Sequence, residues 1–262
     1  RLITGRFSVR VRVGPPNIIK GKIMKSNVLD ESSDFSLPFG KLNFGSVQIA
    51  SKDEVKKSNV WGDIEEETFI ETGTFYGHGV MSAILKGCKD IHTVEINRDI
   101  WKGACNRILS LAIFNKDRGA GVPFEAYSDK HFFSISFNNT MRISLYHGST
   151  VDKLPLMLTR VNQKSCFWLD AHYSGAVTNM DGILDETSEN DIKVPILKEL
   201  DIIRNHHIKN HTIMIDDYEQ VCGSVPGGFE EIKENIKSIN KQYKITKVKK
   251  EDQEDYIIIA KT

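Results

Sequence analysis

Three aspartates follow two apolar, strand-like stretches of the chain. Asp170 comes directly after Phe167-Trp-Leu, and the pair Asp216-Asp217 comes after Ile213-Met-Ile. If these stretches are neighbouring parallel strands, their carboxyl ends meet at one rim of the sheet, where ligands of such sheets bind. Three carboxylates repel one another unless a cation lies among them or one takes a proton, and oxygen ligands without sulfur favour Mg²⁺ or Mn²⁺. We therefore predict metal ligands at Asp170, Asp216 and Asp217.

A turn with three glycines forms a second candidate site. In Phe69-Ile-Glu-Thr-Gly-Thr-Phe-Tyr-Gly-His-Gly79 an apolar strand runs into an acid and then into the turn, and a helix-forming stretch follows. Glycine has no Cβ, so the backbone can turn tightly and a ligand can approach its N–H groups. Glu95 ends the next apolar strand, where an acid is placed to accept hydrogen bonds from ribose hydroxyls. This combination is typical of a domain that holds an adenosine-type cofactor.

Strand and helix patterns alternate from residue 60 onward. Strands are predicted at 67–71, 91–96, 142–147, 165–170 and 211–216, and helices near 80–87, 99–114, 195–206 and 228–240. Such alternation implies a parallel sheet covered on both faces. The last two strand-like stretches, 243–250 and 255–260, are joined by a short acidic turn and must be antiparallel. We predict an α/β fold with a doubly wound, mostly parallel, seven-stranded sheet that ends in an antiparallel hairpin.

Residues 1–59 differ from the rest of the chain. Apolar and polar residues alternate from Phe7 to Val13 with the period of a half-buried strand. No acid precedes Asp30, so this stretch is basic, which fits either a surface for an anionic partner or the solvated face of a hairpin. We predict a β-rich extension or linker over 1–59 and a separate domain over 60–262. The start at Arg1 rather than Met would fit a domain cut from a larger protein.

The composition is that of an ordinary globular protein. The chain has 262 residues, of which 40% are hydrophobic and 27% charged. Lys plus Arg and Asp plus Glu number 35 each, so net charge argues against nucleic acid or an anionic membrane as the partner. No apolar run approaches the roughly 20 residues of a membrane span. The 4 cysteines match no zinc-site spacing, which indicates reduced thiols and a cytoplasmic location.

The glycine turn, the acid after the second strand and the closing hairpin together resemble the class I S-adenosyl-L-methionine (SAM)-dependent methyltransferases over roughly residues 60–262. This resemblance implies a Rossmann-like fold with SAM against the turn. It places the ribose at Glu95 and the adenine near Ser149, within Tyr146-His-Gly-Ser-Thr150. The cofactor residues that it implies are Glu71, Gly73, Thr74, Tyr76, Gly77, Gly79, Glu95, Ser149 and Asp170.

The aspartates resemble those of the metal-dependent sugar O-methyltransferases, the group that contains macrocin O-methyltransferase. In that group an aspartate after the fourth strand and an Asp-Asp pair after the fifth bind Mg²⁺, and the first aspartate is the proposed base. Asp170, Asp216 and Asp217 match these positions. The stretch Ala171-His-Tyr-Ser-Gly175 departs from the macrolide enzymes. It is more similar to methyltransferase domains beside glycosyltransferases in polysaccharide pathways, including those of large DNA viruses, which implies a saccharide or glycoconjugate acceptor and, for a viral protein, the host cytoplasm.

The chemistry expected here is transfer of a methyl group to a hydroxyl. An aliphatic hydroxyl is a poor nucleophile near neutral pH, and coordination to a divalent cation lowers its pKa and orients its oxygen. Either His172 or Asp170 could accept the proton; the residues leave both open, and the family resemblance favours Asp170. The long acidic segment 176–193 beside them is predicted to be a lid over the acceptor. We predict a SAM-dependent O-methyltransferase that uses Mg²⁺ or Mn²⁺ and acts on a sugar or glycan.

Other functions stay open. A catechol-type O-methyltransferase also uses a metal to deprotonate a diol. An NAD-dependent sugar-modifying enzyme is a second alternative, because Gly77-His-Gly-Val-Met-Ser82 is one substitution from the dinucleotide-binding motif. Against it, that motif usually begins directly after the strand, whereas Gly77 falls well after Glu71. A SAM-fold module without activity that binds RNA or protein through its basic N-terminal strand is a third. The sequence does not determine the acceptor hydroxyl or the oligomeric state.

Overall fold

The structure is a computed structural model that describes residues 11–12, 61–62, 64–115, 124–137, 140–173, 193–250 and 255–262. The predicted extension over 1–59 lies outside these ranges except for the short strand β1 (Val11–Arg12). The predicted lid over 176–193 lies outside them except for Lys193. Among the described residues, no helix is both long enough and apolar enough to cross a membrane.

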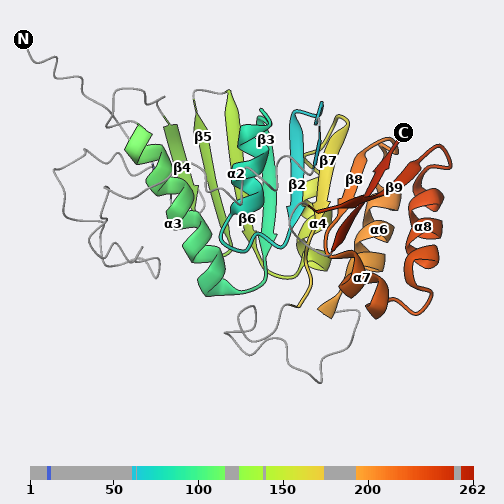
Figure 1. The fold of residues 1–262 in the computed structure, drawn as a ribbon. Coiled ribbons are helices and arrows are strands. Elements are labelled where there is room, and N and C mark those ends of the chain that lie inside the picture. The colour runs from blue at the N-terminus through green and yellow to red at the C-terminus, as the bar shows by residue number, and fades with distance from the viewer. Residues whose placement is uncertain are drawn as a thin grey trace, which may run out of the picture.

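The described strands form one sheet, in the order β1-β4-β5-β6-β3-β2-β7-β8-β10-β9 (Figure 1). Their bounds are β2 Thr68–Thr72, β3 Asp90–Glu95, β4 Phe124–Ser128, β5 Phe132–Phe137, β6 Met141–His147, β7 Ser165–Leu169, β8 Thr212–Ile215, β9 Lys244–Lys249 and β10 Tyr256–Lys261. The run β6-β3-β2-β7-β8 is parallel, while β10 is antiparallel to β8 and β9 to β10. The predicted doubly wound sheet with its closing hairpin is confirmed, and β1, β4 and β5 extend it beyond β6.

Helices cover both faces of the sheet because successive residues of the buried strands point to opposite sides. Phe69 packs in the cluster that contains residues of α2 and α3, whereas its neighbour Ile70 packs in the cluster of α4, α6 and α8. The bounds are α2 His78–Leu85, α3 Arg98–Asn115, α4 Thr150–Leu158, α6 Ile196–Asn205, α7 Tyr218–Ser224 and α8 Gly228–Ile239. In α8 the buried Ile232, Ile236 and Ile239 form the predicted apolar stripe.

The antiparallel strands β4 and β5 were not predicted, and they leave part of one face open. Phe124 and Ala126 of β4, with Phe133 and Ile135 of β5, are buried in the cluster with α3. Residues that point the other way include Glu125, Tyr127, Ser134 and Ser136, which are exposed or half-buried. This side of β4 and β5 therefore packs less tightly than the rest of the sheet.

The topology brings the candidate site residues to one edge. Parallel strands β2, β3, β7 and β8 all end there, so the glycine turn, Glu95, Asp170 and Asp216 follow neighbouring strands. Because β10 runs antiparallel to β8, with Ile258 opposite Ile215, the start of β10 and the end of β9 lie at the same edge. This places the end of β9 beside the aspartates that follow β8.

Candidate active site

The glycine turn after β2 packs directly against the end of β7. Gly73 and Gly77 adopt left-handed backbone angles, with φ values of 83° and 80°, which favour glycine. A Cβ on Gly73 would lie 2.4 Å from the backbone oxygen of Asp170, so only glycine fits this contact. The N–H groups of Gly73 and Thr74 both donate to the carbonyl of Val94, at 3.0 Å. These two hydrogen bonds hold the turn against β3. Contacts of Gly73, Thr74 and Gly77 with a cofactor stay a prediction.

A buried polar network supports the turn from below. Glu71 is 1% exposed, and its carboxylate fills the space above Gly79, where a Cβ would lie 1.7 Å from Oε1. The hydroxyl of Thr93 donates to Glu71 Oε2 at 2.7 Å and lies 2.5 Å from the hydroxyl of Thr74. In the structure the side chains of Glu71 and Thr74 and the packing of Gly79 hold the turn in shape. The predicted contacts of these residues with a cofactor stay a prediction.

Glu95 lies at the edge of the sheet with both carboxylate oxygens held by the backbone. Phe75 N–H donates to Oε2 at 2.8 Å, and Asn97 N–H donates to Oε1 at 2.9 Å. Burial raises the pKa of Glu95, and the nearby Asp170 adds to this, against the lowering effect of the backbone N–H groups. The backbone N–H groups of Asn97, Phe75 and Ile96 thus orient the carboxylate, which keeps some acceptor capacity for a ligand hydroxyl.

The remaining predicted cofactor residues surround Glu95 on the same edge. Gly148 N–H donates to the backbone oxygen of Glu95 at 2.9 Å, and this brings Ser149, the residue before α4, close to it. Tyr76 is 42% exposed and packs beside Gly103 of α3. The predicted set is thus gathered at one rim, with Ser149 and Tyr76 at its outer side.

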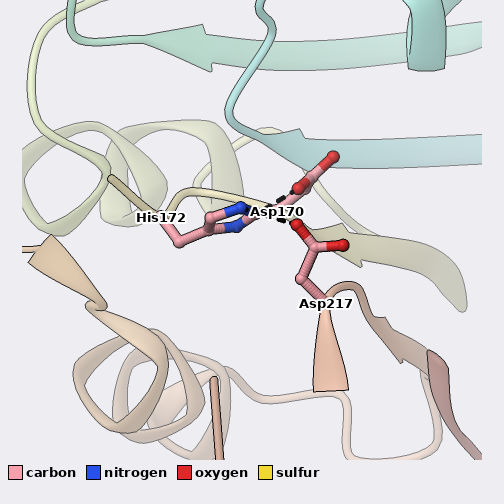
Figure 2. Close-up of side chains that lie close together, drawn as sticks. All are labelled: Asp170, His172 and Asp217. Carbon is pink, nitrogen blue, oxygen red and sulfur yellow. Dashed lines mark ion pairs between the residues drawn. The ribbon is translucent and has the colours of Figure 1, made fainter. Parts of the chain in front are cut away.

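Asp170, His172 and Asp217 form a compact cluster next to the turn (Figure 2). His172 lies between the two carboxylates: its Nε2 is 2.7 Å from Asp217 Oδ2, and its Nδ1 is 3.4 Å from Asp170 Oδ1. One ligand atom from each residue can be chosen so that all lie within 4.8 Å of one another. The indole N–H of Trp168 donates to Asp170 Oδ2 at 3.1 Å and orients it. The predicted meeting of Asp170 and Asp217 is observed, with His172 between them.

Lys250, which was not predicted, supplies a positive charge to this cluster. Its ammonium nitrogen lies 2.6 Å from Asp216 and 3.0 Å from Asp255, and it also pairs with Asp217. Asp216 Oδ1 also accepts the N–H of Asp217 at 2.9 Å. Asp216 therefore faces Lys250 and is not a member of the cluster with His172. Its role as a metal ligand stays a prediction.

The charges in the cluster stabilise one another. Burial alone would raise the pKa of Asp217, but the hydrogen bonds and charges of His172 and Lys250 outweigh it and hold the pKa well below its usual range. Burial would likewise lower the pKa of His172, but the carboxylates of Asp217, Asp170 and Asp216 raise it above its usual value. The structure thus favours the ionised form of Asp217 and makes the imidazole of His172 more basic.

Glu199 of α6 is a buried acid near the cluster. It is 1% exposed, and the hydroxyls of Thr150 and Thr72 hydrogen-bond to it. Burial is the largest cause that raises its pKa, to about 7, and the charge of Asp170 acts in the same direction. The apolar stripe of α6 gives no reason to expect an acid at a buried position, so only the three-dimensional packing reveals this group.

We expect stability to depend on the ionisation of Glu199. In the unfolded chain its pKa is near 4.5, whereas in the folded chain it is about 7, so stability present below pH 4.5 is lost as the pH rises towards 7. Urea unfolding measures the free energy of unfolding at each pH. Between pH 4.5 and pH 8, that of wild type should fall by up to about 3 kcal/mol more than that of Glu199→Gln. Glu234→Gln, at an exposed position of α8, should follow wild type. Parallel pH curves for wild type and Glu199→Gln would contradict this expectation.

The chain was compared with known proteins. No family model matches it, and no curated protein matches its sequence. Among solved structures it is similar to an O-methyltransferase from Bacillus cereus in complex with SAH, at 11% identity and a TM-score of 0.47, over 81% of this chain and 82% of that one. The O-methyltransferase TomG from Streptomyces achromogenes, in complex with SAM, shares 11% identity at a TM-score of 0.42, over 81% of each chain. A ribosomal protein L11 methylase from Lactobacillus delbrueckii subsp. bulgaricus shares 13% identity at a TM-score of 0.40, over 80% of this chain and 76% of that one. These values are too low to establish the reaction of this chain.

Proposed function

We propose that the chain is a SAM-dependent O-methyltransferase that transfers a methyl group to a hydroxyl of a sugar or glycan with the help of a divalent cation. The observation that carries this proposal is the cluster of Asp170, His172 and Asp217 on the same sheet edge as the glycine turn and Glu95. Contact between Gly73 and the backbone of Asp170 joins the two parts of the site. A donor held at the turn would therefore lie next to groups that can take a proton.

Glu95 fits an adenosine-type cofactor. Its two oxygens are oriented by backbone N–H groups, and the carboxylate keeps some acceptor capacity. A ribose hydroxyl would use that capacity. SAM, when bound, would supply a methyl group on a positively charged sulfur. The carboxylates of Asp170 and Glu95 on the same edge favour a positively charged donor over an anionic one.

The cluster also fits a divalent cation. Asp170, His172 and Asp217 offer two carboxylates and an imidazole within the reach of one ion, a donor set that suits Mn²⁺ at least as well as Mg²⁺. A bound cation would lower the pKa of an acceptor hydroxyl. Asp170 and Asp217 would hold it, and His172 would bind only after losing its proton.

Proton transfer is assigned to Asp170 on its position. His172 lies between the carboxylates of Asp170 and Asp217, where its imidazole would serve the cation or pair with them. Asp170 is oriented by the indole N–H of Trp168 and lies at the contact with the glycine turn. We therefore assign the proton acceptor to Asp170, and His172 would position it and balance its charge.

Exposed aromatic rings beside the turn support a saccharide acceptor. Phe75 is 37% exposed and Tyr76 is 42% exposed, and their rings meet edge to face with centroids 4.4 Å apart. Aromatic faces stack well against the apolar side of sugar rings. Tyr218 also lies at this edge, but one face of its ring is covered, because the Lys247 ammonium lies 3.4 Å from the ring centre. Phe75 and Tyr76 are thus the better candidates for acceptor contacts.

The experiment that tests the proposal has two stages. Calorimetry with SAM and with NAD should show binding of SAM only. Methyl transfer from SAM should then be measured with deoxysugars, glycans and catechols, each with Mg²⁺, with Mn²⁺ and with a chelator. We expect transfer to saccharides that the chelator reduces at least a hundredfold. Binding of NAD alone would contradict the proposal that SAM is the cofactor. Transfer to catechols alone would contradict a saccharide acceptor. Full activity with the chelator would contradict a role for the cation.

A further inference from the structure

A cavity beside α4 is lined by residues that the candidate active site does not use. It has a volume of about 590 Å³, within the range of small-molecule sites. It lies between α4 and the turn that joins β4 to β5, on the face of the sheet that β4 and β5 leave open. Its lining residues are Tyr127, Asp129, Lys130, His131, Phe132, Tyr146, Lys153, Leu156, Thr159 and Arg160. None of the residues predicted to hold the cofactor or the metal is among them.

Three permanent cations line this cavity. Lys130, Lys153 and Arg160 form no ion pair with any residue in the described part of the chain. Asp129 is the one carboxylate of the lining, and it accepts hydrogen bonds from the Tyr127 hydroxyl at 3.3 Å and from a backbone N–H at 2.8 Å. The cavity thus has an excess of two positive charges before any histidine is counted. Such an excess without carboxylate partners favours an anionic ligand.

Three aromatic rings form a continuous wall in the same cavity. The ring centroids of Tyr127 and Phe132 are 6.0 Å apart, and those of Phe132 and Tyr146 are 4.9 Å apart. The Arg160 guanidinium lies 5.3 Å from the centre of the Phe132 ring, so the cationic and aromatic walls adjoin. A ring-shaped ligand can stack on this wall while its anionic group reaches the cations.

Tyr146 gives an independent indication of a ligand. It is 6% exposed, and its hydroxyl has no hydrogen-bond partner among the described residues. A buried hydroxyl without a partner is unfavourable, because burial removes it from water without replacing the lost hydrogen bonds. Burial raises the pKa of Tyr146, so the hydroxyl keeps its proton and has no acceptor for it among the described residues.

We propose that this cavity is a binding site for a phosphorylated ring compound, with the ring against Tyr127 and Phe132 and the phosphates on Lys130, Lys153 and Arg160. Phosphate groups carry close to two negative charges near neutral pH and several strong acceptor oxygens, which match three cations. A nucleoside diphosphate and a sugar phosphate share this chemistry. The cavity adjoins the predicted cofactor site, because Lys153 packs against Gly148, but none of its lining residues belongs to the predicted cofactor or metal set.

The test is calorimetry on the full chain without SAM. Titrants are UDP, glucose 1-phosphate, uridine and inorganic phosphate at equal ionic strength. We expect UDP or glucose 1-phosphate to bind at least tenfold more tightly than inorganic phosphate or uridine. Lys153→Gln and Tyr127→Ala should each weaken that binding about tenfold, because one removes a charged donor and the other a stacking ring. Lys241→Gln, an exposed control beyond α8, should leave it within twofold.

Each outcome decides the assignment. Tighter binding of UDP than of glucose 1-phosphate supports a nucleotide ligand, and the reverse order supports a phosphorylated sugar. Binding of the phosphorylated rings no tighter than inorganic phosphate would overturn the proposal, since the aromatic wall would then play no part. An equal loss of affinity in Lys241→Gln would also overturn it, because the attraction would then be general to the basic surface. Thermal unfolding confirms that each variant is folded.

Discussion

Replacing Asp217 with asparagine is expected to reduce turnover about a thousandfold and to leave the affinity for SAM within about twofold. Asparagine keeps the size of the side chain and tolerates the left-handed backbone of Asp217, whose φ is 47°. What it removes is the negative charge that faces His172 Nε2 at 2.7 Å and pairs with Lys250. Initial rates with saturating SAM and calorimetry with SAM measure the two effects separately.

Asp255→Asn is the matched control for that substitution. Asp255 also pairs with Lys250, at 3.0 Å, but it is not a member of the cluster with Asp170 and His172. We expect it to retain turnover within about threefold, because Lys250 keeps Asp216 and Asp217 as partners. If Asp217→Asn stays within tenfold of wild type, or if both substitutions reduce turnover equally, the cluster has no special role in the reaction.

Sequence periodicity predicted the main sheet and its site edge. Fully apolar stretches such as Phe167-Trp-Leu can only be central strands, since both faces of the sheet are buried there. Once these strands were recognised, the rule that ligands bind at their carboxyl ends brought Asp170 and Asp217 together, as the structure does. Only the direction of each strand is needed to predict this part of the site, and the sequence pattern gives that direction.

Side-chain direction could not be predicted in the same way. Asp216 and Asp217 are neighbours in sequence and both pair with Lys250, yet of the two only Asp217, with its left-handed backbone, pairs with His172. Sequence patterns predicted an antiparallel closing hairpin but did not place Lys250 in the site. The pairing of β10 with β8 and the register of β9 with β10 bring Lys250 there.

The hairpin of β4 and β5 was missed for a different reason. Its residues alternate between buried and half-exposed, a weaker signal than the continuous apolar runs of the central strands. The helix α4 was also missed, and it contains Pro155, which lacks a backbone N–H and usually ends a helix. The cavity proposed to bind a phosphorylated ring lies between these two elements, so sequence patterns gave no indication of it.

Substituting Gly73 with alanine is expected to destabilise the fold by about 3–5 kcal/mol. The φ of 83° alone disfavours alanine, and the added Cβ would lie 2.4 Å from the backbone oxygen of Asp170. Neither backbone can move freely, since Gly73 N–H bonds to Val94 and Asp170 N–H bonds to Thr72, both at 3.0 Å. Urea unfolding measures the loss, and the remaining folded protein should show reduced turnover because Asp170 must shift.

Gly87→Ala separates the two contributions. Gly87 has almost the same backbone angle, with a φ of 86°, but no atom lies within 4 Å of a Cβ built there. Alanine at this position should therefore lower the free energy of unfolding by about 1–2 kcal/mol, through the unfavourable backbone angle alone, and should leave turnover unchanged. The difference between the two variants is the free energy of the contact between the glycine turn and Asp170. Equal destabilisation by both would mean that this contact yields easily, and the turn would then not fix the position of Asp170.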